Sequence, residues 1–209
     1  MNSPAPSRRI PFALLAGVLL ILCAAAGALL YRAQSGGSGE TPPLAGADIG
    51  GPFALVDGDG AAVTEKSYPG QWKLIYFGYT FCPDICPTDM QQLAQGLRQF
   101  EKADATRAAK VQPLFVTIDP ARDTGPVVKT FTAAFHPRFI GLTGTQPQID
   151  AALKTFRVYA SKGAGTADAY LMDHSAIAYI FDPAGKPISF LPQGSSPEAV
   201  AAELAKWVR

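Results

Sequence analysis

The chain has 209 residues, 48% of them hydrophobic, and its 18 basic and 17 acidic side chains leave a formal net charge of +1. This length suits one ordinary domain plus an appendage, and the apolar fraction is sufficient for a packed core. A nucleic-acid-binding protein is excluded, because no basic run occurs beyond the first nine residues. Three cysteines are too few for a disulfide framework.

An apolar segment lies close to the amino terminus. Arg8 and Arg9 precede an uncharged apolar run, and Arg32 follows it. At about 1.5 Å per residue the run reaches the roughly 30 Å of a hydrocarbon core, so residues 10–32 are predicted to form one transmembrane anchor. The positive-inside rule places the tail, residues 1–9, in the cytoplasm. The shortness of this tail favours a single-pass protein of the bacterial inner membrane, with its domain facing the periplasm.

Two other interpretations of this segment remain open. Small residues at positions 24–28 offer cleavage sites for a signal peptide. Cys23 could instead carry a lipid, although the bulky Leu22 before it is unlike the small residue of lipoprotein processing signals. All three interpretations put the domain on the same side of the membrane.

Residues 33–46 are rich in Gly, Ser and Pro and are predicted to form a flexible linker to a folded domain over residues 47–209. The domain begins with short apolar strands at 53–56 and 62–64, which flank the turn signal Asp57-Gly58-Asp59-Gly60. This pattern predicts a β-hairpin. The two aspartates of the turn also resemble the start of a calcium loop, but the remaining ligand positions are absent, so the turn is favoured.

Strands and helices then alternate, which predicts a sheet with parallel strands joined by helices. Functional loops are expected at the carboxyl ends of those strands. Buried strands are expected at Trp72–Gly78, Pro113–Ile118 and Phe139–Thr143. Helices are expected through Met90–Phe100, Val127–Phe135 and Ile149–Phe156, and Met90 belongs to the apolar face of the first of them.

The last third of the domain begins with a segment, Gly163–Asp168, that is typical of a mobile loop. It leads to Asp173-His174-Ser175 and to a strand over residues 176–181, which a turn connects to a return strand over residues 187–191. A final helix is predicted after Ser196, whose hydroxyl is expected to cap it.

Two cysteines lie where the first buried strand ends and the first helix begins. Each is followed by proline, which disfavours the helical conformation for the residue before it. We therefore expect Cys82 to close the end of the strand and Cys86 to cap a helix whose first residue is Pro87. The free amides of that helix would then point to Cys86 and favour its thiolate. A structural disulfide or two inert thiols are the alternatives.

Two thiolates and one imidazole form a soft site of low coordination number, which suits Cu(I). Of the two histidines, His136 is predicted to be a surface residue that ends a helix. His174 lies between the predicted loop and a buried strand, where it could reach the cysteines. A structural zinc would need four ligands, and only three good ones are in view, although an open three-ligand zinc site remains an alternative. Asp84 and Asp119 are candidates for a position behind the ligands or for ordinary turn residues.

The chain resembles the Sco/SenC family of membrane-anchored copper chaperones for cytochrome c oxidase assembly. The resemblance spans about Pro52 to Leu191. It depends on the cysteine stretch, on Thr117-Ile118-Asp119-Pro120-Ala121-Arg122-Asp123, and on Asp173-His174-Ser175 followed by Tyr179 and Asp182-Pro183-Ala184-Gly185.

This resemblance implies an α/β, thioredoxin-like fold with an added β-hairpin and copper ligation by Cys82, Cys86 and His174, with His136 outside the ligand set. The copper would be Cu(I), with Cu(II) as a second state, and the same two cysteines would form the redox disulfide. The implied role is delivery of copper to, or reduction of cysteines in, the dinuclear copper site of cytochrome c oxidase subunit II. A periplasmic thioredoxin-like reductant or another copper chaperone is a further partner.

A competing hypothesis makes the protein an enzyme rather than a metallochaperone, namely a periplasmic thiol–disulfide oxidoreductase or a redox sensor without an essential metal. In that case His174 would be dispensable. A peroxidase is disfavoured because the residues before Cys82 lack the required constellation of proline, hydroxyl and arginine. A purely structural, membrane-tethered module is the remaining alternative.

Overall fold

The computed structural model describes residues 40–166 and 169–209, and Pro42–Arg209 form one compact unit. The predicted tail and transmembrane anchor, residues 1–9 and 10–32, lie outside the described residues, as does the first half of the predicted linker, residues 33–39. Among the helices that are described, none has the length and apolar character needed to cross a bilayer. Leu44 already belongs to the compact unit, because its amide donates to the carbonyl of Ile188 at 3.1 Å.

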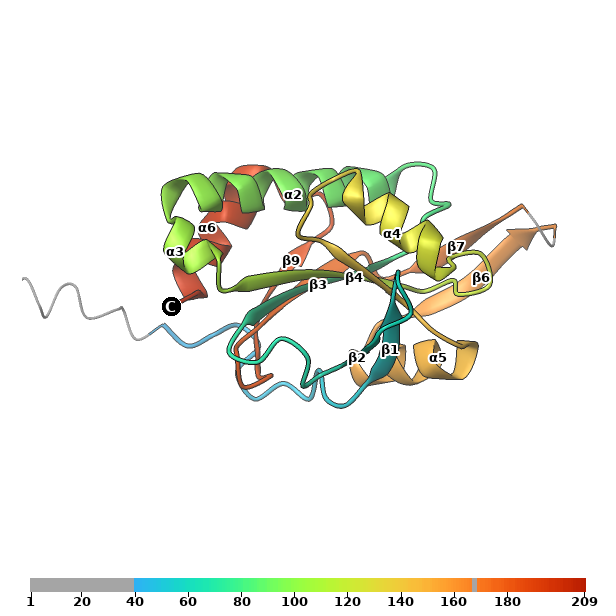
Figure 1. The fold of residues 1–209 in the computed structure, drawn as a ribbon, viewed down its shortest axis with the longest axis horizontal. Coiled ribbons are helices and arrows are strands. Elements are labelled where there is room, and N and C mark those ends of the chain that lie inside the picture. Colours follow the sequence, from blue (N-terminus) through green and yellow to red (C-terminus); the bar gives the residue numbers. More distant parts are fainter. Residues whose placement is uncertain (1–39, 167–168) are drawn as a thin grey trace, which may run out of the picture. The chain divides into compact units, whose positions relative to one another are not determined.

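Seven strands form one mixed sheet in the order β2-β1-β5-β4-β3-β8-β9 (Figure 1). The parallel part consists of β3, β4 and β5, and the other neighbours in the sheet are antiparallel. The strands are β1 (Ala54–Asp57), β2 (Ala62–Thr64), β3 (Trp72–Gly78), β4 (Val111–Thr117), β5 (Ile140–Thr143), β8 (Ile177–Phe181) and β9 (Pro187–Pro192). The predicted hairpin, parallel strands and return strand are therefore confirmed.

Helices cover both faces of the sheet, which is why every residue of β3 is buried (Figure 1). One face packs against α2 (Ile85–Ala103), α4 (Gly125–Ala133) and α6 (Pro197–Trp207), and the other packs against α5 (Gln146–Thr155). A short helix, α3 (Ala105–Ala108), follows α2. The predicted cap of α6 is present, since the Ser196 hydroxyl accepts a hydrogen bond from the amide of Ala199 at 3.3 Å.

The turn between β1 and β2 is confirmed as a turn held by an aspartate. Asp57 Oδ1 accepts the amides of Asp59 and Ala61, both at 2.9 Å. The carboxylate of Asp59 instead contacts the Lys129 ammonium.

The segment predicted as a loop before His174 contains a strand. β6 (Ala160–Gly165) pairs antiparallel with β7 (Tyr170–His174) in a separate two-stranded ribbon, with Ala160 opposite His174. The sequence did not indicate this strand, because five of its six residues are Ala, Ser or Gly and the run has no alternation of apolar and polar side chains. Its pairing arises from the backbone of β7, which lies so close that a Cβ on Gly163 would be 3.1 Å from the Leu171 carbonyl oxygen.

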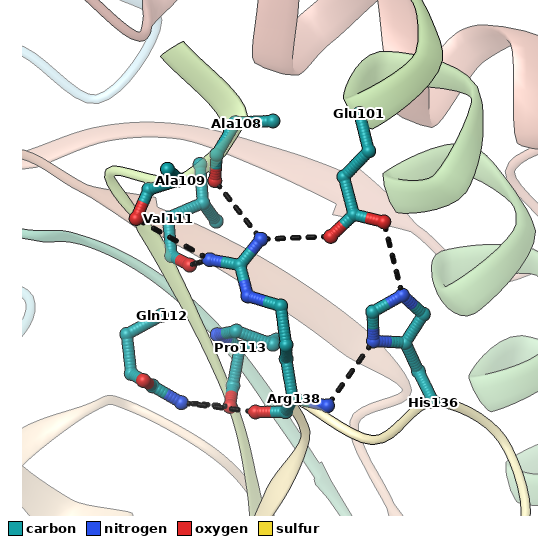
Figure 2. Close-up of polar contacts among 8 residues, drawn as sticks. All are labelled: Glu101, Ala108, Ala109, Val111, Gln112, Pro113, His136 and Arg138. Atoms are coloured by element: carbon teal, nitrogen blue, oxygen red, sulfur yellow. Dashed lines mark hydrogen bonds and ion pairs between the residues drawn. The ribbon is translucent and has the colours of Figure 1, made fainter. Parts of the chain in front are cut away.

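His136 was predicted to be a surface residue, and this is wrong: its side chain is only 4% exposed. Figure 2 shows the ring between Glu101, on α2, and the backbone of Arg138. His136 Nδ1 accepts the Arg138 amide at 3.2 Å, and Nε2 lies 3.3 Å from a Glu101 carboxylate oxygen. Both contacts are satisfied by the neutral tautomer with its proton on Nε2.

Arg138 extends this network to the start of β4 (Figure 2). Its guanidinium donates to Glu101 at 2.8 Å, to the Ala108 carbonyl at 3.1 Å and to the Val111 carbonyl. The network thus joins α2, α3 and β4 to the segment before β5. The buried polar groups of this network are hydrogen-bonded to one another, because a buried polar group without a partner is energetically costly.

The burial of His136 should make the domain less stable in acid. Burial lowers the pKa of His136 from its ordinary value of 6.5, against the opposing effect of Glu101. The unfolded state therefore binds more protons than the native state just below that value, and the free energy of unfolding should fall as the pH decreases through this range.

We expect His136→Gln, which keeps a donor and an acceptor, to weaken this pH dependence in urea unfolding followed at about pH 5 and about pH 7. Burial also lowers the pKa of His174, so part of the dependence should remain in the variant. Identical pH dependence in the wild type and the variant would contradict this account.

Candidate metal centre

Cys82 lies in the loop between β3 and α2, Cys86 lies in the first turn of α2, and a buried carboxylate anchors the start of this loop. Asp123 accepts the amide of Thr80 at 3.0 Å and its hydroxyl at 2.6 Å, and it also accepts the Thr117 hydroxyl at 2.6 Å. Burial raises the pKa of Asp123, although the hydroxyls of Thr117 and Thr80 act in the opposite direction. The end of β4 therefore fixes the start of the cysteine loop. Asp123 had not been singled out from the sequence as a functional residue.

The helix after the loop begins two residues earlier than predicted. Ile85 is its first residue and Asp84 its cap, so Cys86 lies in the first turn and Pro87 is the third helical residue. Proline is tolerated there, because the amides of the first turn have no partner within the helix and the residue four positions before it lies outside the helix. The expectation that Cys86 caps the helix is thus wrong.

The amides of this first turn point to Cys82 rather than to Cys86. The Cys86 amide donates to Cys82 Sγ at 3.4 Å. Burial opposes ionisation of Cys82, but the hydrogen bonds from the amides of Cys86 and Asp84 and from the side chains of Cys86 and Tyr79 together lower the pKa of this thiol. The backbone amide of Asp84 therefore helps to lower the pKa of Cys82. The side chain of Asp84 makes no hydrogen bond that caps the helix.

Cys86 has a contrasting environment, because it is fully buried between α2 and the sheet. Burial is the main cause that raises the pKa of its thiol, and the neighbouring Cys82 sulfur adds to it. Space for the sulfur exists because Gly78 has no side chain: a Cβ there would lie 3.1 Å from Cys86 Sγ. Met90, one turn further along α2, is fully buried in the core, as predicted.

His174 reaches this site from the last position of β7. Its Nε2 lies 3.4 Å from Cys86 Sγ, and its Nδ1 lies 3.1 Å from the carbonyl oxygen of Ser175. Since a carbonyl only accepts, Nδ1 carries the proton and the lone pair of Nε2 faces the sulfur. The edge of the ring meets Tyr79, with 6.0 Å between ring centroids. Burial lowers the pKa of His174, partly offset by the Ser175 carbonyl.

A cavity of about 440 Å³ opens beside these groups, and both Cys82 and His174 line it. Its rim carries exposed apolar side chains, since Tyr159 is 62% exposed and Leu171 is 54% exposed. Within residues 40–166 and 169–209, no three His, Cys, Asp or Glu side chains already converge as a metal cage. The structure thus joins His174 to Cys86 directly and brings Cys82 to the same cavity.

Asp119 lies behind β7 rather than beside the sulfurs. Its carboxylate accepts the Tyr170 hydroxyl at 2.7 Å and the Arg122 guanidinium at 2.6 Å. Arg122 also donates to the Tyr170 carbonyl at 3.0 Å, and its guanidinium lies 3.6 Å from the centre of the Tyr170 ring. Asp119 and Arg122 thus hold Tyr170, the first residue of the strand that ends in His174. The sequence indicated Asp119 but gave no reason to choose Arg122 or Tyr170.

Comparisons with known proteins agree with this fold. The sequence model of the SCO1/SenC family matches residues 41–209. Protein SenC of Rhodobacter capsulatus is 42% identical over 157 residues, which are 75% of this chain and 69% of that protein. The human mitochondrial SCO1 homologue is 37% identical over 162 residues, which are 77% of this chain and 53% of that protein. The chain spans about half the length of several such curated relatives.

The solved structures lead to the same assignment. The crystal structure of Arabidopsis thaliana ScoI with copper bound has a TM-score of 0.71 and 35% sequence identity, and the match covers 76% of this chain and 97% of that one. The mixed sheet with helices on both faces is accordingly the thioredoxin-like fold of these proteins, with the β1–β2 hairpin preceding β3. On the evidence of the matched sequence and the shared fold, this chain belongs to the SCO1/SenC family.

Proposed function

We propose that the domain binds one copper ion through Sγ of Cys82, Sγ of Cys86 and Nε2 of His174, and that it serves as a copper chaperone. The observation that carries this proposal is the 3.4 Å contact between His174 Nε2 and Cys86 Sγ, which joins residues 88 positions apart. Copper is the cargo of such a protein rather than a resident cofactor. The copper-bound ScoI structures of Arabidopsis thaliana and Bradyrhizobium japonicum support the proposal.

The donor set fits Cu(I) better than structural zinc. Two sulfurs and one imidazole are soft donors of low number, whereas structural zinc takes four protein ligands. Asp119 is already engaged by Arg122 and Tyr170, so it could serve as a fourth ligand only by leaving those contacts.

The three donors differ in how readily they lose their protons. Cys82 has a lowered pKa and lines the cavity, so it is the donor that first meets an entering ion. Cys86 is buried as a thiol whose sulfur faces the lone pair of His174 Nε2, so its proton must leave before its sulfur can bind. The carbonyl of Ser175 accepts a hydrogen bond from the protonated Nδ1 of His174, so the lone pair of Nε2 remains available to bind the metal.

Within this proposal the receiving site is the dinuclear copper site of cytochrome c oxidase subunit II. The domain would act from the periplasmic face of the bacterial inner membrane, anchored by residues 10–32. The exposed apolar side chains around the cavity suit contact with a protein partner, because such patches mark interaction surfaces.

A second candidate function is thiol–disulfide exchange, and the asymmetry of the two thiols favours it. Both cysteines are free. Cys82 is partly exposed with a lowered pKa, as an attacking thiol should be, and Cys86 is buried behind it, as a resolving thiol should be. The two functions differ in their need for His174, because an imidazole is required as a copper ligand and not for dithiol exchange.

Replacement of His174 separates the two functions. For the reduced full-length protein, competition titration with a Cu(I) chelator should show that His174→Ala loses at least about tenfold in Cu(I) affinity, since even groups behind a metal ligand cost that much when removed. His136→Gln is the matched control and should bind as the wild type does. The oxidised protein should bind weakly, because a disulfide offers no thiolate. Equal affinity in wild type and His174→Ala would refute the ligand assignment.

The difference between the two thiols predicts their order of alkylation. Because the pKa of Cys82 is lowered and that of Cys86 is raised, iodoacetamide should modify Cys82 first, and at a pH below the ordinary pKa of a free thiol. Time-resolved fragment mass spectrometry of the reduced protein measures this. Modification of Cys86 at the same rate as Cys82 would mean that the helix amides do not select Cys82.

The anchor is tested by the fate of the chain after cell fractionation. The full-length protein should remain with the membranes after alkaline carbonate extraction, whereas a variant that begins at Ala33 should be released. Extraction of the full-length protein by carbonate would argue against a retained membrane helix.

A further inference from the structure

A second cavity, of about 530 Å³, lies near the beginning of β3, away from the cysteines that follow the end of that strand. Its volume is within the range of small-molecule sites. Most of its wall is apolar. The apolar wall consists of Pro52, Phe53, Pro69, Ile75, Phe156, Phe181 and Pro183.

The cavity exists because α5 covers only part of its face of the sheet. Beyond the end of α5, the covering is made by chain segments without regular structure: residues 51–53 before β1, residues 65–70 before β3 and the turn at 183–185. The chain passes closely there, since a Cβ on Gly50 would be 2.5 Å from the Phe181 ring. These segments leave room between them that no side chain fills.

The floor of the cavity carries Lys73, the second residue of β3. Its side chain is on the same face of the strand as that of Ile75, because alternate residues of a strand share a face. Lys73 is only 5% exposed, yet within the described residues its ammonium makes no hydrogen bond or ion pair. Lysine is rarely buried to this degree unless it is paired.

The neighbouring charges do not satisfy this ammonium. Burial lowers the pKa of Lys73, and the electrostatic effect of Asp182 opposes this without a direct contact. Asp182 instead accepts the amide of Lys186 at 2.8 Å. Glu65 lines the cavity but accepts the amide of Phe53 at 3.3 Å. The cavity thus contains a cation that lacks an anion at contact distance.

We propose that this cavity is a binding site for an apolar monocarboxylate, whose carboxylate pairs with the ammonium of Lys73 and whose hydrocarbon body lies against Phe53, Phe156 and Phe181. Burial of an ion is most favourable when it is paired with an opposite charge, and a bound carboxylate would supply that charge to Lys73. The aromatic side chains favour a body of low polarity. The site is independent of the copper proposal, since it uses none of Cys82, Cys86 or His174.

The test is a titration of the full-length protein, kept in solution with a mild detergent and followed by amide chemical shifts. The probes are 3-phenylpropionate and hexanoate, which separate an aromatic from an aliphatic body, each with its neutral amide analogue. The shifts should be confined to the segments that line the cavity, which are residues 51–53, 65–70, 73–75, 183–185 and the surroundings of Phe156 and Phe181. The neutral analogues should bind at least about tenfold more weakly, because an amide carbonyl can still accept a hydrogen bond from Lys73 but lacks the negative charge that attracts the ammonium.

Lys73→Met tests the role of the ammonium. It should reduce the affinity for either carboxylate at least about tenfold, and it should leave the melting temperature unchanged or higher, because an unpaired buried charge is removed. Lys154→Met, on the exposed side of the adjacent α5, is the matched control and should bind as the wild type does.

Three results would overturn the proposal. They are the absence of shifts at the cavity with both carboxylates, equal binding of the carboxylates and their neutral analogues, and shifts that fall at residues 81–85 and 171–175 instead. The comparison of charged and neutral probes uses only the wild-type protein, so the proposal remains falsifiable even if Lys73→Met does not fold.

Discussion

The contact between His174 Nε2 and Cys86 Sγ is the interaction on which the candidate site depends. Other parts of the fold hold each of the two residues in position. Cys86 is held by the first turn of α2 and by the space above Gly78. His174 is held at the end of a ribbon that is separate from the main sheet, so its position depends on how β7 is attached. Figure 1 shows this ribbon at the end of the sheet where α2 begins.

A buried polar network attaches β7 to the rest of the domain. Its hydrogen bonds form in only one position of β7. Asp119 and Arg122, both just after β4, bind the hydroxyl and the carbonyl of Tyr170. Buried polar groups need their hydrogen-bond partners, and a displaced ribbon would take the Tyr170 hydroxyl from Asp119 and the Tyr170 carbonyl from Arg122. Asp123, from the same short segment, holds the cysteine loop. One segment after β4 therefore positions both halves of the site.

The titratable groups at the two ends of β3 differ in the partners that surround them. After its carboxyl end, the helix amides favour a thiolate on Cys82, while burial keeps Cys86 as a thiol. At its amino end, Lys73 is buried in an apolar cavity without an anion at contact distance among the described residues. Side chains along a central strand are shielded from water because both faces of the strand are covered. The protonation state of each titratable group near this strand therefore depends on the groups that it contacts.

The sequence by itself determined the elements whose signals are local. The alternation of strands and helices, the hairpin turn at Asp57, the cap at Ser196 and the position of Cys82 between β3 and α2 all follow from spacing, turn residues and prolines, and the structure confirms them. Each of these signals depends on a few neighbouring residues, so it can be recognised without knowledge of the rest of the chain.

Only the tertiary structure decided the strand β6, the burial of His136 and Lys73, and the direction of the helix amides towards Cys82. It also decided that Arg122 and Tyr170 support Asp119. Each of these depends on partners that are distant in the chain: a glycine-rich strand forms where another backbone offers hydrogen bonds, and a polar side chain is buried where a remote group satisfies it or a cavity admits it. Short-range patterns cannot carry that information, because pairing and burial are properties of the assembled fold.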